Sequence, residues 1–421
     1  MKIKKLQAGA LQLTIFISIV IGVILASFIL LMQLHKRFEV QTSFIKETVN
    51  NAQSGIDYAL INDMVLNDST FLNIYDEEYK TLSLYKNYWG IFEKVTSKSK
   101  IKKQWFIKTA LIGTSQSDNN RTALYLQDNK KPLILVGNTK IEGTAYLPEQ
   151  GVKPGNISGH SYYGAQLIYG NIYKSMDLPK FSSELLNHLS HYKTINDSHF
   201  IDMGTDRAFA NSFTKPKKQI YSTGDILLTN ITLNGHIEVV SETKIIVGTS
   251  AVLNDIVLMA PEIEIKDYVE GAFQALANKN IAVGKQCRLH YPSALVLVPK
   301  KESNDDELNR PNTTKQIDIG DGSEITGTVI FYGKTKPNNF NPQLIIRKGS
   351  IVKGEVYCSS NLELKGRVYG TVFTSDFVAK ESGSIYQNHI YNGNIIIKEL
   401  PAQYVGISFE ASNKGIIKWL Y

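Results

Sequence analysis

Hydrophobic and polar residues follow three different patterns along the chain. Residues 13–32 form a run of 20 without a charged side chain. The next stretch places apolar residues three or four positions apart, which is typical of one face of a helix. Most of the remaining sequence alternates apolar and polar residues in short runs separated by Gly, Asn or Asp, which is typical of strands. The pattern therefore predicts a mainly β protein behind a long N-terminal helix.

The uncharged run predicts a single transmembrane helix over residues 13–32, because 20 residues rising 1.5 Å each span about 30 Å, the thickness of a bilayer core. A cleaved signal peptide is the alternative. Such peptides have shorter apolar cores and a small-residue cleavage site, which Leu30 to Leu34 does not offer. The expected membrane-anchor residues are Leu13, Ile17, Ile21, Gly22, Leu25, Phe28 and Met32.

Basic residues on either side of this run predict its orientation. Lys2, Lys4 and Lys5 precede it with no acidic residue, whereas the basic residues that follow are diluted by Glu39 and Glu47. The positive-inside rule then places residues 1–12 in the cytoplasm and the bulk of the chain in the periplasm or outside the cell.

The helix is expected to continue through residues 33–66 as a juxtamembrane amphipathic segment. Its packing stripe is Ile45, Val49, Ala52 and Ile56, extended by Thr42 and Ala59 at the same spacing. Such a stripe suits contact with a partner helix or with a second copy of the chain.

The N-terminus resembles the leaders and helices of type IV minor pilins and pseudopilins. The residues that carry the likeness are "KKLQAGALQL", with Lys4 and Lys5 before Gly9 and the apolar run beginning at Ala10. The resemblance implies processing after Gly9 and helix packing in a filament. Thr14 stands where the family has a glutamate at the fifth mature position. A plain membrane anchor that continues into a short coiled coil is the alternative.

Residues 67–130 are expected to form a small α+β neck. Phe71 to Phe92, rich in Tyr and acidic residues, is predicted to be helical. "KKQWFIKTALIGTS" and "RTALYLQD" alternate apolar and polar residues and predict two antiparallel strands.

From residue 131 a phrase of two or three short strands recurs about every 16 to 22 residues, as in "GSIVKGEVYCS" and "LKGRVYGTVFTS". We interpret residues 131–399 as a parallel β-solenoid, with an insertion at 148–218 that contains a helix "SSELLNHLSHY" and a polar loop at 300–315. Residues 400–421 are expected to cap its last coil. The glycines expected where coils turn or backbones approach closely are Gly349, Gly354, Gly366 and Gly370.

The coils near residues 320–394 resemble bactofilins, polymer-forming bacterial proteins with a right-handed β-helix core. "GSIVKGEVY" and "LKGRVYGTVF" carry the likeness. The resemblance implies the fold and a tendency to stack end to end. Bactofilins are mostly cytoplasmic, which the membrane anchor contradicts.

Composition adds a modest net charge of +7. The densest basic cluster is Lys94, Lys98, Lys100, Lys102, Lys103 and Lys108. It is interpreted as a solvated face, with attraction to anionic lipid head groups or envelope polymers as the sharper alternative. No nucleic-acid-binding module accompanies the lysines, so no nucleic-acid partner is expected. Cys287 and Cys358 are expected to be free thiols.

Three groups of residues are candidates for reactive sites. Glu184, His188 and His191, with His199 beyond, could hold a metal on one helix face, but an amphipathic surface helix explains them as well. Asp197, Asp202 and Asp206 with Arg207 could serve glycan cleavage, but loop acids are common. "GDGSEITG" lacks the Gly-Lys-Ser/Thr end of a phosphate loop and is interpreted as a turn. The sequence thus predicts no catalytic residue, no metal and no cofactor.

Two functions remain open. The first is a non-enzymatic, membrane-anchored envelope protein with a structural, assembly or surface-interaction role, bound to the lipid bilayer and to protein partners or to itself through the helix or the solenoid ends. The second is a membrane-tethered carbohydrate-binding or glycan-cleaving protein. Its site would lie in the insertion at 148–218, where an envelope glycan would stack on the rings of Tyr162, Tyr163, Tyr169 and Tyr173; ordinary strand residues are the alternative interpretation of these tyrosines.

Overall fold

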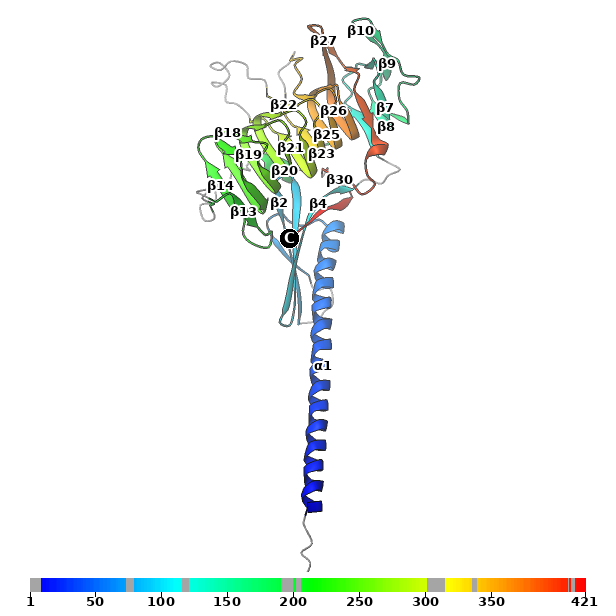
Figure 1. Ribbon diagram of the computed structural model, residues 1–421. Coiled ribbons are helices and arrows are strands. Elements are labelled where there is room, and N and C mark those ends of the chain that lie inside the picture. Colours follow the sequence, from blue (N-terminus) through cyan, green and yellow to red (C-terminus); the bar gives the residue numbers. More distant parts are fainter. Residues whose placement is uncertain are drawn as a thin grey trace, which may run out of the picture.

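The computed structural model describes residues 9–72, 79–115, 121–190, 200–201, 206–300, 315–334, 339–407, 409 and 413–421. The protein consists of a long N-terminal helix, an antiparallel sheet beside the C-terminal half of that helix, and a large body of short parallel strands (Figure 1). It is therefore mainly β with one long helix, as the residue pattern predicts.

Helix α1 runs from Gly9 to Ile61, about 80 Å, without a proline to interrupt it. Its N-terminal half extends away from the rest of the protein (Figure 1). The amphipathic helix expected to reach residue 66 ends earlier, at Ile61, where the Asn62 side chain donates a hydrogen bond to the carbonyl of Tyr58 over 3.0 Å. That bond satisfies one of the last helix carbonyls and helps to stop the helix.

The antiparallel sheet draws strands from both ends of the chain. Its members are β1 (Ser69–Leu72), β2 (Lys80–Trp89), β3 (Phe92–Ile101), β4 (Gln104–Ser115), β30 (Val405–Gly406) and β31 (Lys414–Leu420). The order is β1-β2-β3-β4, and both β30 and β31 then pair with the outer edge of β4. Strands that follow α1 and strands near the C-terminus are thus joined in one sheet.

The helix predicted over Phe71 to Phe92 is wrong. Those described residues form parts of β1 and β2, and β2 shows the strand period of two, with Leu82 and Leu84 buried next to half-buried Ser83 and exposed Tyr85. Burial of alternate side chains against α1 therefore overrides the local composition.

Two further expectations for this region are corrected. β4 does not pair with the strand that follows it: β5 (Thr122–Leu126) pairs in parallel with strands of the body instead. The C-terminal "IIKWLY" does not lie on the end of a coil. It forms β31, whose Leu420 is the register partner of Thr109 in β4. Both segments satisfy open strand edges that local sequence does not reveal.

The body is built from parallel pairs of short strands in residues 122–174 and 208–396, which we call the parallel stack. Apart from β5, its strands are β6 (Leu133–Val136), β7 (Lys140–Glu142), β8 (Thr144–Leu147), β9 (Val152–Pro154), β10 (Asn156–Ile157), β11 (His160–Ser161), β12 (Ile172–Lys174), β13 (Ala208–Asn211), β14 (Lys218–Ser222), β15 (Ile226–Leu228), β16 (Thr232–Gly235), β17 (Ile237–Ser241), β18 (Lys244–Val247), β19 (Val252–Ile265), β20 (Glu270–Val283), β21 (Arg288–Leu297), β22 (Gln316–Ile319), β23 (Glu324–Phe331), β24 (Leu344–Ile346), β25 (Ile351–Leu364), β26 (Arg367–Glu381), β27 (Ser384–Gln387), β28 (His389–Tyr391) and β29 (Asn394–Ile396). The antiparallel exceptions are β10 with β11 and β26 with β27.

Parallel pairing keeps like residues in register. One column of register partners inside the stack reads Val239, Leu258, Ala275, Leu295, Val329, Val356, Val372 and Leu124. All of them are buried in one core, which also contains the free thiols of Cys287 and Cys358. The repeating apolar phrase of the sequence thus supplies a continuous interior.

The stacking order differs from the chain order. β5 pairs with β26, and β7 pairs with β29, so the first strands of the stack lie against the last ones (Figure 1). β12 then forms one end of the described stack, and β13, the next strand along the chain, pairs only with β16 at the other end. The insertion at 148–218 therefore contains strands at one end of the stack, such as β12, and the segment between β12 and β13, which we call the crossing segment. Its expected helix is α2 (Ser183–Ser190).

The four glycines expected at turns or close backbone approaches occupy such positions. Gly354 and Gly370 have φ of 144° and 151°, and they pair in register with each other and with Gly327. A β-carbon on Gly370 would collide with the carbonyl oxygen of Gly354, so this column accepts no side chain. Gly349 lies at a turn with φ of 78°, and Gly366 is crowded by the carbonyls of Ser350 and Arg347.

Two more apolar cores hold α1, the antiparallel sheet and the stack together. One lies between α1 and the antiparallel sheet and includes Ile56, Leu84 and Ile112. The other lies between the opposite face of that sheet and the outer face of the stack, and the crossing segment contributes Phe181 and Leu185 to it. The antiparallel sheet is therefore sandwiched between α1 and the stack.

Candidate membrane and assembly surface

The N-terminal half of α1 presents apolar side chains with no protein partner. All the described residues from Gly9 to Ser43 are exposed. Six of the expected anchor residues are 46% to 71% exposed; they are Leu13, Ile17, Ile21, Leu25, Phe28 and Met32. The seventh, Gly22, is exposed, and a β-carbon on it would meet nothing within 4 Å. Within the described residues, α1 is the helix long and apolar enough to cross a membrane.

Two hydroxyl groups of this segment form hydrogen bonds within the helix. Thr14 Oγ1 donates to the carbonyl of Leu11 over 2.9 Å, and Ser27 Oγ donates to the carbonyl of Val23 over 2.8 Å. Because these two hydroxyls bond within the helix, neither would be left unpaired in hydrocarbon.

The C-terminal half of α1 is docked on the sheet through one stripe. The buried residues are Thr48, Asn51, Ala52, Gly55, Ile56 and Ala59, spaced three or one apart so that they share one face. The expected stripe lies partly here: Ala52 and Ile56 are buried, Val49 is half-buried, and Ile45 is 49% exposed. Contact with the sheet thus begins near residue 48.

Small and polar residues set the distance between helix and sheet. A β-carbon on Gly55 would collide with Ser97 Oγ and Leu84, so the backbone of α1 lies directly on β2 and β3. One turn before it, Asn51 Nδ2 donates to Ser99 Oγ over 3.1 Å in a buried bond. A buried hydrogen bond of this kind fixes the rotation of the helix on the sheet, because breaking it leaves polar groups unpaired.

Charged contacts extend the docking to the lower edge of the sheet. Lys80 of β2 forms an ion pair with Glu47, and the Lys102 ammonium lies 4.5 Å from the centre of the Phe44 ring. The sheet therefore follows α1 as far as Phe44 and leaves the preceding residues uncovered.

The other face of the sheet is locked to the stack by buried polar contacts. Gln274 accepts a hydrogen bond from the backbone N–H of Ile91 and donates one to the carbonyl of Trp89, both over 2.9 Å, so it holds the β2–β3 turn. Lys418 of β31 binds both carboxylate oxygens of Asp255 at 2.6 and 2.8 Å. These contacts hold the antiparallel sheet on the stack, while α1 packs on the other face of the sheet.

A buried histidine lies in this junction. His236 Nδ1 donates to the carbonyl of Lys215 over 2.9 Å, which leaves Nε2 to accept from the Lys94 ammonium at 3.0 Å. Burial, followed by the Lys94 charge, lowers the pKa of His236 to about 3. Burial, followed by the charge of Lys217, lowers the pKa of Lys94 to about 8. The imidazole is therefore neutral near neutral pH.

A buried carboxyl group anchors the C-terminal segment. Glu355 Oε2 of β25 accepts a hydrogen bond from the backbone N–H of Ile407 over 2.6 Å. Burial raises the pKa of Glu355 to about 7, against the lowering effects of that bond and of the Arg121 charge. Arg121 in turn donates to the carbonyls of Leu400, Pro401 and Ala402.

The residues weighed for metal binding are used in packing. His188 stacks on Tyr88 with ring centres 4.7 Å apart and contacts the carbonyl of Gly90, while Glu184 pairs with Lys86 at 3.0 Å. Burial lowers the pKa of His188. In the described part of the chain, no group of three His, Cys, Asp or Glu side chains is placed to hold a metal ion. His191, His199, Asp197 and Asp202 lie outside the described residues, and Asp206 and Arg207 are exposed.

The four tyrosines predicted as glycan contacts lie between residues 162 and 173, at the end of the stack that contains β12. Tyr163 is 60% and Tyr173 51% exposed. Tyr162 donates its hydroxyl proton to the carbonyl of Gln166, and Tyr169 lies under the Lys140 ammonium at 5.3 Å. Tyr173 instead neighbours Tyr146, with ring centres 5.4 Å apart. The structure thus leaves Tyr163 and Tyr173 as exposed rings but does not gather the four into one surface.

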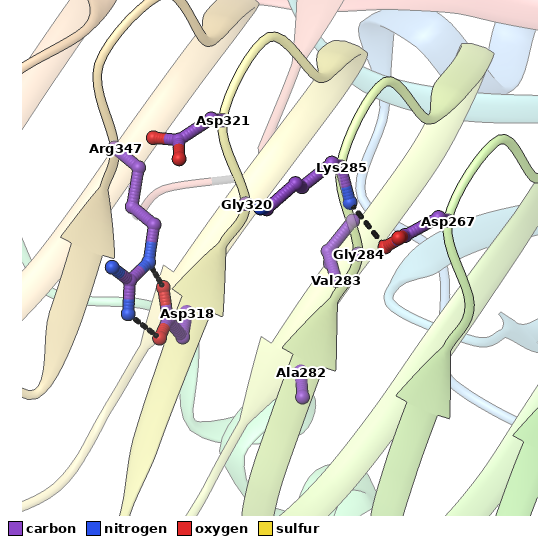
Figure 2. Close-up of a pocket in the computed structure, with 9 residues that line it drawn as sticks. All are labelled: Asp267, Ala282, Val283, Gly284, Lys285, Asp318, Gly320, Asp321 and Arg347. Carbon is purple, nitrogen blue, oxygen red and sulfur yellow. Dashed lines mark hydrogen bonds and ion pairs between the residues drawn. The ribbon is translucent and has the colours of Figure 1, made fainter.

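"GDGSEITG" forms a turn that leads into β23. It lines a shallow depression at one corner of the stack with Asp267, Lys285, Asp318 and Arg347 (Figure 2). The Arg347 guanidinium donates to both Asp318 carboxylate oxygens at 2.7 Å, and the backbone N–H of Lys285 donates to Asp267 over 2.7 Å. These contacts connect neighbouring coils, so the corner is held by its own charged groups.

Sequence reasoning missed several residues that hold these surfaces together, including Asn51, Gly55, Gln274 and Glu355. Asn51 and Gly55 share the helical spacing of Ala52 and Ala59, so the stripe could have included them. Gln274 and Glu355 carry no local signal, because their partners are 183 and 52 residues away in the sequence.

Comparisons with known proteins add little. No family model matches the chain, and no curated protein matches it. Among solved structures, the competence-associated pilin ComZ from Thermus thermophilus is similar over 90% of this chain and 96% of its own, with 8% identity and a TM-score of 0.20. A TM-score that low does not establish a shared fold. None of these comparisons supports the bactofilin resemblance.

Proposed function

We propose that this chain is a single-pass, membrane-anchored envelope protein without enzymatic activity, whose body serves assembly or surface interaction. In this proposal residues 13–32 cross the bilayer, residues 1–12 remain in the cytoplasm, and the body lies in the periplasm or outside the cell. The body would be a rigid parallel β-solenoid, which the in-register column from Val239 to Leu124 supports.

One observation carries the proposal: α1 is a single helix with two different environments. Its N-terminal half exposes every side chain, including Leu30 at 66% and Met32 at 71%, whereas its C-terminal half is buried on the sheet. So large an apolar surface is costly in water but stable in a bilayer. Helix α1 would also hold the antiparallel sheet and the stack at a fixed height above the membrane.

An assembly role is supported by apolar residues that lie beyond the span yet are not covered by the sheet. Leu34, Phe38 and Ile45 are 54%, 60% and 49% exposed. A partner helix or a second copy would bury them, which is how the resemblance to pilins would apply. Processing after Gly9 belongs to this proposal. The ends of the stack are a second possible route to self-association.

Membrane fractionation tests the proposal. The full chain should remain in the membrane pellet through alkaline carbonate washing, and a chain lacking residues 1–40 should be soluble. Protease added to intact spheroplasts should cleave the body. Recovery of the full chain in the soluble fraction would refute the anchor, and protection of the body would refute the orientation. Mass spectrometry of the N-terminus then decides whether cleavage occurs after Gly9.

Glycan contact is the second candidate, favoured by the exposure of Tyr163 and Tyr173 at the end of the stack that contains β12. Aromatic faces stack on sugar rings, and these two rings are accessible. Sedimentation with purified cell-wall polysaccharide tests it: binding that is lost in Tyr163→Ala/Tyr173→Ala but kept in Tyr268→Ala would favour this candidate. Tyr268 is an exposed tyrosine elsewhere on the stack, at 66%.

A further inference from the structure

The β3–β4 hairpin projects past the stack along α1, and one of its faces is uncovered there (Figure 1). Along β3, Ser97 and Ser99 face α1, so Lys94, Lys98 and Lys100 point to the opposite side. Lys94, at the upper end, is buried against the stack, whereas Lys98 and Lys100 are exposed. The stack therefore covers the top of this face and leaves the tip open.

The open tip is strongly basic and aromatic. Lys102 and Lys103 form its turn and are exposed, and Trp105, the register partner of Lys100, is 65% exposed. Residues 98–106 contain no acidic side chain. Glu47 of α1 is paired with Lys80, and the acidic residues 76–78 lie outside the described residues. Lysines beside an exposed tryptophan are the composition of a membrane-interface segment.

Docking on α1 fixes the height of this tip. Lys102 lies over the ring of Phe44, twelve residues after Met32, where the apolar run ends. Twelve helical residues rise about 18 Å, of which the head-group layer takes roughly 5 to 7 Å. The remaining gap of about 11 to 13 Å lies between one and two Debye lengths at physiological ionic strength, and lysine side chains reach into it. Lys36 and Arg37 lie below, at the level of the head groups.

We propose that the β3–β4 tip, with Lys98, Lys100, Lys102, Lys103 and Trp105, is a second membrane contact that recognises anionic lipid head groups of the bilayer crossed by α1. Charge complementarity carries this assignment, since a basic surface held close to an anionic leaflet is attracted to it. The contact would limit tilting of the body on its rod. The inference rests on the proposed anchoring by α1.

Quenching of Trp105 tests the contact. The full chain is placed in nanodiscs of phosphatidylcholine, or of an equal mixture with phosphatidylglycerol, each with a lipid carrying a spin label on its head group. Trp105 is the most exposed of the three tryptophans, since Trp89 is 2% exposed and Trp419 is half-buried. The quenched signal is assigned by its loss in Trp105→Phe. We expect stronger quenching in anionic discs, reduced at high salt.

Matched variants separate the possible results. In Lys100→Gln/Lys102→Gln/Lys103→Gln the ratio of anionic to zwitterionic quenching should fall severalfold towards one, because each lysine near an anionic surface contributes on the order of a fivefold preference and only Lys98 remains at the tip. The control Lys153→Gln/Lys279→Gln/Lys348→Gln removes three exposed lysines of the stack and should leave the ratio unchanged. Equal quenching in both discs would overturn the inference while leaving the anchor intact. Failure of the chain to enter either disc would instead overturn the proposed function.

Discussion

Gly55 of α1 lies directly against the Ser97 side chain of β3, with no space for a β-carbon between them. This contact lies within the buried stripe that holds the helix on the sheet. The position of the antiparallel sheet on α1 therefore depends on a residue without a side chain.

Replacing this glycine should loosen the docking. We expect Gly55→Leu to destabilise the helix–sheet interface by about 1 to 3 kcal/mol, because overpacking a close contact forces the backbone apart. Thermal unfolding of the detergent-solubilised chain measures the effect. Gly22→Leu is the matched control, since a side chain there meets nothing within 4 Å. Equal melting temperatures for the two variants would contradict the close contact.

The glycine column of the stack makes a similar prediction. A β-carbon on Gly370 would collide with the carbonyl oxygen of Gly354, and φ at Gly370 is 151°, a conformation that side chains disfavour. We expect Gly370→Ala to cost on the order of 1 to 3 kcal/mol in unfolding free energy. Gly224→Ala, at a site with space and no positive φ, should change stability by much less. An unaltered unfolding midpoint for Gly370→Ala would show that the coils can separate to admit a methyl group.

The buried carboxyl group gives a pH dependence of defined sign. The pKa of Glu355 is raised from 4.5 to about 7, so its protonated form is favoured in the folded state. Its contribution to stability is complete below pH 4.5 and is lost as pH rises through 7. We expect Glu355→Gln, which keeps an oxygen for the Ile407 N–H, to be more stable than the parent at pH 8 by up to about 3 kcal/mol.

Urea unfolding at pH 5 and pH 8 measures this difference. The gain from Glu355→Gln should be small at pH 5 and larger at pH 8. Glu324→Gln serves as the control, because Glu324 is partly exposed and pairs with Lys353 at the surface. If the stability gained by Glu355→Gln did not grow with pH, ionisation of Glu355 would not be the cause of that gain.

The buried histidine predicts the opposite sign. The pKa of His236 is lowered from 6.5 to about 3, so its contribution to stability is present above pH 6.5 and is lost as pH falls towards 3. We expect His236→Gln to lose less stability than the parent between pH 7 and pH 4, even if it starts lower because the ring packs on Phe213 and Trp89. Melting temperatures across that range measure the slope. Exposed His290→Gln should retain the slope of the parent.

The sequence predicts the elements of this protein better than their partners. A run of 20 uncharged residues and a stripe at Ala52 and Ile56 are local patterns, and they correctly indicate a long helix. Alternating phrases correctly indicate short strands in parallel pairs, because each strand repeats the same buried positions. The similarity of these phrases is also why the order of stacking is hidden. Many coils could accept β5, and only the folded chain selects β26.

The errors share one cause. Residues 80–89 form a strand because Leu82 and Leu84 lie on α1, and "IIKWLY" forms a strand because the edge of β4 is open to it. Both depend on residues far away in the sequence. The apolar run of α1 can be identified from the sequence alone. The basic tip of the β3–β4 hairpin cannot, because it is recognised only by its position beside Phe44 in the fold.

The central claim is that the exposed half of α1 lies in a bilayer while the rest of the chain stands outside it. Labelling of single cysteines in intact spheroplasts with a membrane-impermeant maleimide tests it most directly, in a parent in which the buried Cys287 and Cys358 are replaced by Ala. Cysteine at exposed Lys348 should be labelled, and cysteine at Ile21 should not. Labelling at Ile21, or protection of position 348 until the membrane is permeabilised, would contradict the account.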